Sequence, residues 1–168
     1  AVGAILLTNT YVTLLKFTMF DIPEAHHHGK DALKYHAVRR SRVTAILWLT
    51  GFPLSLLGIS ITGLGLVGAV NCVATGEGST FARMCFCWGP WLTWEWQAIN
   101  KSLHSSHHPL IHRLKTISMA VCAFGFLMPL ALDLGTTAGL IFNMSVMAIL
   151  LLSEVCVEIY YEGKMYGW

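Results

Sequence analysis

The sequence contains little charge for its length. Only 12% of its 168 residues are Asp, Glu, Lys or Arg, whereas about 25% is usual in a soluble domain. Hydrophobic residues make up 55% of the chain, and the formal net charge is only +2. This composition excludes an ordinary cytosolic domain, a disordered protein and a nucleic-acid-binding protein with a basic face. The class of protein that this composition favours is a small integral membrane protein.

Cysteines are also few and follow no regular spacing. The chain has five, at Cys72, Cys85, Cys87, Cys122 and Cys156. An odd number of cysteines without a regular spacing pattern argues against a fold that is held together by disulfide bonds. Histidine, by contrast, is abundant, with eight residues in two clusters.

Four stretches are apolar enough to cross a membrane, which predicts an all-α integral membrane bundle. Val43–Val70 contains no charged residue and is longer than the ~20 residues that the hydrocarbon core requires. Pro53 is expected to kink this helix. The other predicted spans are residues 81–99, 116–132 and 138–157, with loops at 71–80, 101–115 and 133–137.

The two ends of the chain are more polar than these spans. Residues 1–20 are apolar but interrupted by Thr, Asn and Lys, which favours a helix lying on the membrane or against a partner over a fifth span. The chain is therefore divided into an interfacial segment 1–42, a transmembrane bundle 43–157 and a polar C-terminal tail 158–168.

The few basic residues predict the orientation of a four-span bundle. Eight of the eleven fall before span one or between spans two and three: Lys30, Lys34, Arg39, Arg40, Arg42, Lys101, Arg113 and Lys115. These two segments lie on the same side in a four-span topology, and Lys164 joins them, whereas Arg83 lies opposite. The positive-inside rule places the basic side in the cytoplasm or matrix.

All eight histidines fall on that basic side, and three interpretations stay open. They are His26, His27, His28, His36, His104, His107, His108 and His112. Histidines at a membrane surface bond lipid phosphates, partner subunits or water. His104, His107 and His108 have the H-x-x-H-H spacing of membrane di-iron hydroxylases and desaturases, and imidazole is a suitable iron ligand. The third interpretation is haem ligation or quinone chemistry at the membrane edge.

The start of span one carries a family resemblance. It reads His36-Ala-Val-Arg-Arg-Ser-Arg42-Val-Thr-Ala, and Pro53 follows Arg42 by eleven residues. This pattern resembles the small cytochrome-b anchor subunit of succinate dehydrogenase, mitochondrial complex II. Residues 87–89, Cys-Trp-Gly, resemble its His-Trp-Gly, and residues 133–135, Asp-Leu-Gly, resemble its Asp-Val-Gly. The large anchor subunit is a close competitor, because Ser41 to Thr44 and the pair His107 and Arg113 also resemble its motifs.

This resemblance implies a non-catalytic anchor in the mitochondrial inner membrane, with its histidine-rich side toward the matrix. Such a subunit tethers the iron–sulfur and flavoprotein subunits beside a second membrane anchor and phospholipid, with cardiolipin expected. It contributes to a ubiquinone pocket, here expected at Ser41, Arg42, Trp96 and Lys101. Two alignments of span two are open and point to Trp96 or to Lys101. Haem b would involve Cys87, His104 or His107.

The sequence departs from this family at three places. Cys85 and Cys87 occupy the neighbourhood of the usual haem-ligating histidine, the Asp-Tyr pair at the quinone end is absent, and residues 136–168 add a fourth span. A structural accessory subunit of another respiratory complex and a di-iron hydroxylase are therefore the alternatives.

Several residues have a structural interpretation beside the functional one. Ser41 is also a helix cap, and Arg42 is also a basic anchor that snorkels to phosphates. Glu95 is the only carboxylate within the first three spans, and an ionisable group there is a functional candidate. The glycines of span one predict close helix packing.

Overall fold

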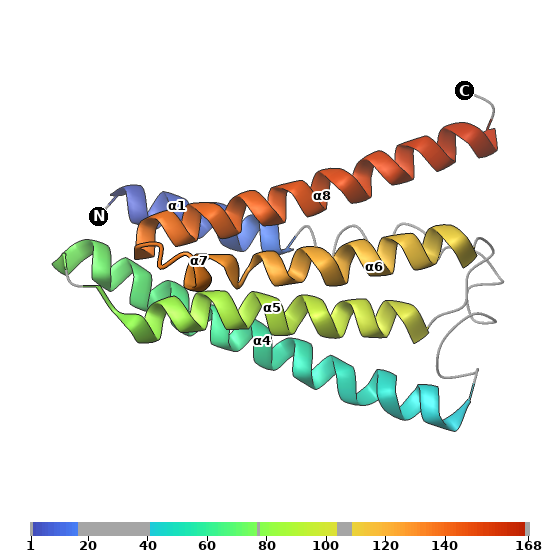
Figure 1. Cartoon of the computed structure of the whole chain (residues 1–168), viewed down its shortest axis with the longest axis horizontal. Coiled ribbons are helices and arrows are strands. Elements are labelled where there is room, and N and C mark those ends of the chain that lie inside the picture. Colours follow the sequence, from blue (N-terminus) through green and yellow to red (C-terminus); the bar gives the residue numbers. More distant parts are fainter. Residues whose placement is uncertain (1, 17–40, 77, 104–108, 167–168) are drawn as a thin grey trace.

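The computed structural model describes residues 2–16, 41–76, 78–103 and 109–166, and every regular element in them is an α-helix (Figure 1). The predicted all-α fold class is therefore confirmed. The helices are α1 (Val2–Lys16), α4 (Arg42–Thr75), α5 (Thr80–Leu103), α6 (Pro109–Gly125), α7 (Met128–Ala131) and α8 (Thr136–Tyr166).

The long helices α4, α5, α6 and α8 lie lengthwise beside one another (Figure 1). The α4–α5 turn and the α7–α8 turn lie at one end of the bundle, which we call the turn end. The start of α4, the end of α5, the start of α6 and the end of α8 lie at the other end, which we call the basic end. The predicted antiparallel order of the apolar segments is thus present.

Two helices are long and apolar enough to cross a membrane: Arg42–Cys72 within α4 and Thr136–Ser153 within α8. Helix α5 is long but carries Arg83, Glu95 and Lys101. The third predicted span, 116–132, is not continuous, because α6 ends at Gly125 and α7 starts at Met128. Pro129, in the first turn of α7, has no N–H to donate and its ring would clash with the Gly125 carbonyl in an unbroken helix.

Two other boundaries differ from the sequence-based expectation. The predicted loop 71–80 is shorter, since α4 continues to Thr75. Gly76 ends α4 in the left-handed region at φ 76°, and its N–H donates to the Cys72 carbonyl at 2.9 Å, an arrangement that favours glycine. At the other end of the chain, α8 continues through most of the predicted tail, to Tyr166.

Helix α1 lies along the bundle rather than flat across its end (Figure 1). It contacts α8 and α4, and the side chain of Tyr11 is wholly buried among core residues that include Trp94 and Met147. Fifteen residues rise only about 22 Å, which is less than the ~30 Å hydrocarbon core. The N-terminal helix is thus part of the bundle core.

A stripe of small residues on α4 forms the closest helix contact. Its buried members repeat every three or four residues, which keeps them on one face: Gly51, Ser55, Gly58, Thr62, Gly65, Ala69 and Cys72. A Cβ added at Gly65 would lie 2.9 Å from the Phe86 Cα of α5. Small residues let helix backbones approach this closely, so the predicted role of Gly58 and Gly65 in packing is confirmed, whereas Gly63 has no neighbour within 4 Å.

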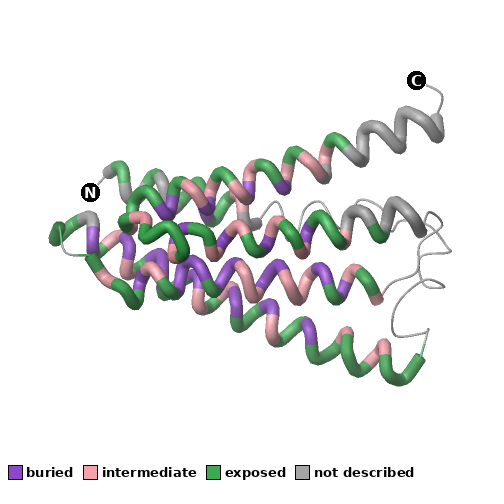
Figure 2. Tube along the Cα trace, viewed as in Figure 1, coloured by how far each residue is buried: buried purple, intermediate pink, exposed green. Residues whose placement is uncertain are grey.

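Many large apolar side chains point outward. Figure 2 shows exposed positions in every helix. Among the exposed large side chains are Ile46, Phe52, Leu64, Phe81, Val121, Phe124, Ile149 and Leu152. The interface between α4 and α5 buries the polar residues Ser55, Thr62, Thr93 and Asn100. Large apolar residues therefore lie both in the core, as Trp94 and Met147 do, and on the outside of the bundle.

Candidate functional site

Ser41 is the N-cap of α4. Its Oγ accepts from the Thr44 N–H at 3.1 Å, and the Thr44 Oγ1 accepts from the Ser41 N–H at 3.0 Å. These reciprocal bonds satisfy two donors that would otherwise be unpaired at the helix start. The capping interpretation of Ser41 is therefore confirmed.

Replacing Ser41 by alanine is expected to lower the free energy of unfolding by about 1 kcal/mol, because the Thr44 N–H loses its acceptor. Ser41→Asn keeps a side-chain acceptor and is expected to restore the stability. Denaturation in detergent micelles measures both. Equal losses for the two variants would contradict a capping role.

The four predicted quinone-binding residues do not converge on one point. Gly51 faces Asn100 and Gly58 faces Thr93, and this antiparallel register puts Trp96 level with Ser55. Trp96 is therefore about 20 Å deeper in the bundle than Arg42, and Lys101 about 12 Å deeper. Arg42 is exposed at the basic end, whereas the Lys101 Nζ reaches the Met119 Sδ of α6 at 3.5 Å.

Of the predicted haem ligands, only Cys87 lies within the described residues, and its side chain is buried. The Cys87 Sγ is 3.8 Å from the Asn143 Nδ2 of α8. Cys87 is thus a packed thiol. His104 and His107 lie outside the described residues.

The proposed di-iron box at His104, His107 and His108 also lies outside the described residues. Within the described part of the chain, no three His, Cys, Asp or Glu side chains are grouped so as to hold a metal ion.

A buried hydrogen bond between α5 and α8 repairs a defect in α5. Pro90 has no N–H, so the Phe86 carbonyl four residues earlier loses its helical donor. The Asn143 Nδ2 donates to that carbonyl at 2.9 Å, and Asn143 is fully buried. An unpaired carbonyl would be costly in an apolar interior, so Asn143 joins the two helices at a defined position. In the sequence, this hydrogen bond was indicated only by a proline inside one apolar segment, Pro90, and a polar residue inside another, Asn143.

The turn end holds a single ion pair among the described residues. The Arg83 Nη2 donates to the Asp133 Oδ1 at 2.6 Å, and the Asp133 side chain is 86% exposed. An exposed ion pair of this kind contributes about 0.2–1 kcal/mol to the stability of the fold. It nevertheless compensates Arg83, whereas Arg42, Lys101 and Arg113 belong to the basic end.

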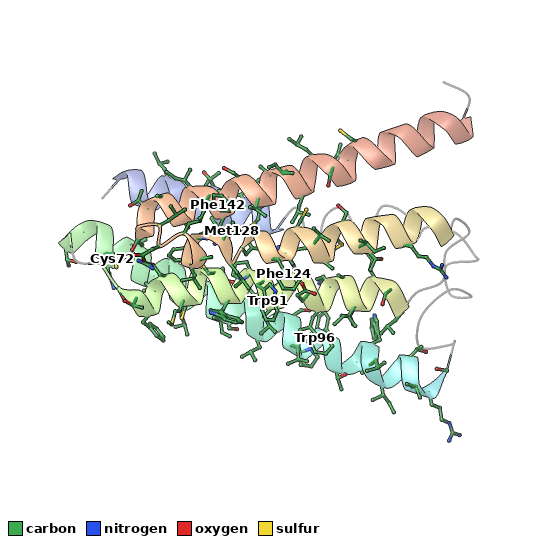
Figure 3. All side chains as sticks on the ribbon, in the orientation of Figure 1. Cys72, Trp91, Trp96, Phe124, Met128 and Phe142 are labelled. Carbon is green, nitrogen blue, oxygen red and sulfur yellow. The ribbon has the colours of Figure 1, made fainter. Side chains whose placement is uncertain are left out.

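Polar and aromatic groups do converge on the seam between α5 and α6. Trp88, Trp91 and Glu95 follow one another at three- and four-residue intervals and share one face of α5. The Trp88 and Trp91 rings meet edge to face at 5.2 Å, and Trp91 lies 6.2 Å from the Phe124 ring of α6 (Figure 3). We call Trp88, Trp91, Glu95 and Phe124 the seam cluster.

Two polar atoms of the seam cluster are buried and unpaired within the described structure. They are the Trp91 Nε1 and the Glu95 Oε1, one a donor and the other a carboxyl oxygen. Five further buried side-chain atoms lack a hydrogen-bond partner in the described structure, one each on Tyr11, Arg83, Trp94, Asn100 and Asn143, so the missing partner alone does not distinguish a ligand site. The sequence already singled out Glu95 as a carboxylate within a predicted span.

Comparison of the chain with protein-family models, curated proteins and solved structures finds no match. Among the described residues, the seam cluster is the candidate functional site.

Proposed function

We propose that the chain is a multi-pass membrane-anchor subunit of a quinone-reducing oxidoreductase, with α4, α5, α6 together with α7, and α8 as its four spans. The observation that carries the membrane assignment is the large number of apolar side chains on the outside of the bundle. Gly, Ser and Thr line the α4–α5 interface, while Ile46, Phe52 and many similar residues face outward. In water these exposed side chains would favour aggregation, whereas a lipid environment accommodates them.

The distribution of charge supports an orientation. Arg42, Lys101 and Arg113 belong to the basic end, and the lone Arg83 at the turn end is paired with Asp133. By the positive-inside rule the basic end faces the compartment where the protein is made or the mitochondrial matrix. A soluble partner would dock at this end, as the resemblance to the succinate dehydrogenase anchors implies.

In this proposal the redox chemistry belongs to partner subunits. The anchor would hold those subunits at the membrane and provide helix walls for a lipid-soluble quinone. Succinate is the electron donor that the resemblance implies, and the iron–sulfur and flavin subunits would carry its electrons to ubiquinone.

Cysteine accessibility tests the four-span topology. In a background without native cysteines, Gly78→Cys and Gly135→Cys at the turn end are expected to react with an impermeant maleimide from one side of the membrane. Ser41→Cys and Ser102→Cys at the basic end are expected to react only from the other side. Labelling of Gly78→Cys and Ser102→Cys from the same side would contradict the topology.

Native purification of the assembly tests the anchor role. Co-purification of a covalent flavoprotein and an iron–sulfur protein in stoichiometric amounts is expected. If the chain is extracted from the membrane with other partners, or with none, the succinate dehydrogenase proposal is contradicted. The proposed membrane topology is not affected by that result.

A further inference from the structure

We propose that the outer face of α1 binds the same face of a second copy of this chain inside the membrane, with the two Asn9 side chains hydrogen-bonded to each other. The inference rests on the membrane assignment of the proposed function but not on its redox partners. It assigns an interaction surface to the N-terminal helix, which is not one of the four proposed spans.

The outer face of α1 comprises Leu6, Asn9 and Thr13, which are all exposed. They follow one another at intervals of three and four residues, so they form one stripe along the helix. At about 100° per residue, Asn9 and Thr13 each lie about 160° around α1 from Tyr11, whose side chain is wholly buried in the bundle. The stripe therefore faces away from α4 and α8, which α1 contacts.

This stripe lies at the depth of the membrane. Helix α1 starts at the turn end and packs beside α8 (Figure 1), whose candidate span starts at Thr136 at the same end. With a rise of about 1.5 Å per residue, Asn9 lies about 10 Å and Thr13 about 16 Å along α1 from its start at Val2. Both depths fall within the ~30 Å hydrocarbon core.

Asn9 differs from the other asparagines in its surroundings. The chain has four asparagines, and Asn9 is the one that is both exposed and in the middle of a helix. Asn100 and Asn143 are buried, and Asn71 lies about one turn before the end of α4 at Thr75. No described residue pairs with the Asn9 carboxamide. A carboxamide that faces lipid without a partner is costly, so we expect a polar partner from another helix.

A second copy of the chain is complementary to this surface. A carboxamide both donates and accepts, so two Asn9 side chains can bond each other reciprocally. Two copies inserted in the same orientation are related by a twofold axis along the membrane normal, so their α1 helices run parallel with the two Asn9 residues level. The spacing of Leu6, Asn9 and Thr13 is the seam spacing of parallel helix pairs, and none of the three is charged.

Energy transfer between copies of the full chain in phosphatidylcholine vesicles tests the interface. Donor- and acceptor-labelled chains carry the dye at Gly78→Cys in the background without native cysteines, and the protein-to-lipid ratio is varied. Asn9→Ala removes both reciprocal hydrogen bonds and is expected to weaken dimerisation about tenfold. Asn9→Gln keeps a carboxamide and is expected to stay within about threefold of the parent. Asn71→Ala is the matched control, because it removes an exposed carboxamide near a helix end, and it is expected to change dimerisation by less than about twofold.

Disulfide cross-linking locates the contact on α1. On oxidation with copper phenanthroline, two Thr13→Cys chains in the same background are expected to cross-link with each other, because position 13 lies on the shared stripe. Ser145→Cys is the control, since Ser145 is exposed on α8 and lies at a similar depth, about 14 Å from Thr136. It is expected not to cross-link.

The outcomes separate this interface from the anchor proposal. Energy transfer that Asn9→Ala weakens and Asn71→Ala does not, with circular dichroism unchanged, supports the interface. Energy transfer that is absent, or equal in the Asn9→Ala and parent chains, overturns it, as does cross-linking of Thr13→Cys to a different subunit in the purified assembly. A dimer without flavoprotein partners would keep the interface and reject the succinate dehydrogenase anchor. Flavoprotein partners with a monomeric chain would reject the interface alone.

Discussion

Replacing Gly65 by alanine is expected to lower the free energy of unfolding by about 3 kcal/mol, the largest effect we predict for one methyl group. The added Cβ would meet the backbone nitrogen of Phe86 and lie 2.9 Å from its Cα. A backbone atom cannot rotate away as a side chain can, so α4 and α5 must separate along their whole contact. Titration with a denaturing detergent measures the loss.

Gly63→Ala is the matched control for this variant. Gly63 lies two residues away on the same helix, and a Cβ there has no neighbour within 4 Å. Alanine is expected to stabilise this position by about 0.5–1 kcal/mol, because glycine is a poor helix former. Equal stabilities of Gly63→Ala and Gly65→Ala would show that the two helices do not pack through the small-residue stripe.

Replacing Asn143 by leucine is expected to lower the free energy of unfolding by about 2 kcal/mol, because the buried Phe86 carbonyl loses its hydrogen-bond donor. The loss should depend on Pro90. In a Pro90→Ala background the alanine N–H bonds the Phe86 carbonyl within α5, so Asn143→Leu is expected to cost less than about 0.5 kcal/mol there. The double-mutant cycle therefore predicts a coupling of about 1.5 kcal/mol.

Ser145→Ala provides the control for the Asn143 cycle. Ser145 lies on the same helix, but its Oγ donates to the Ile141 carbonyl of its own helix and is exposed. Its replacement is expected to change stability by less than about 0.5 kcal/mol in either background. A coupling between Asn143 and Pro90 near zero would contradict the proposed repair of α5.

Local features of the fold were predictable because each depends on neighbouring residues. Ser41 was a predicted cap and does start α4, whereas the predicted end at Val70 falls five residues before the end of the helix at Thr75. The third predicted span, 116–132, was expected to be one helix but is divided into two. The prediction relied on the apolar character of these residues and gave less weight to Pro129. Pro129 lies in the first turn of α7, where its missing N–H is tolerated, whereas Pro53 and Pro90 lie inside continuous helices.

The candidate site was only partly predictable. Glu95 stood out as a carboxylate in an apolar stretch, which a linear sequence shows directly. Arg42, Trp96 and Lys101 were grouped by resemblance, but the rise of α5 and its register against α4 separate them by roughly 12–20 Å along the bundle. Phe124, which completes the aromatic wall beside Trp91, lies on another helix and carried no sequence signal.

The sequence by itself determined that the chain is helical, poor in charge and divided into long apolar segments, because composition and local spacing are sufficient for these properties. Only the tertiary structure decided which polar groups meet. Asn143 pairs with a carbonyl 57 positions away, and Arg83 with an aspartate 50 positions away. Such contacts depend on helix register and on the close approach that small residues permit. The low charge therefore predicts a membrane environment, while the helical repeat of α5 places Glu95, the only carboxylate of the first three predicted spans, on the same face as Trp91.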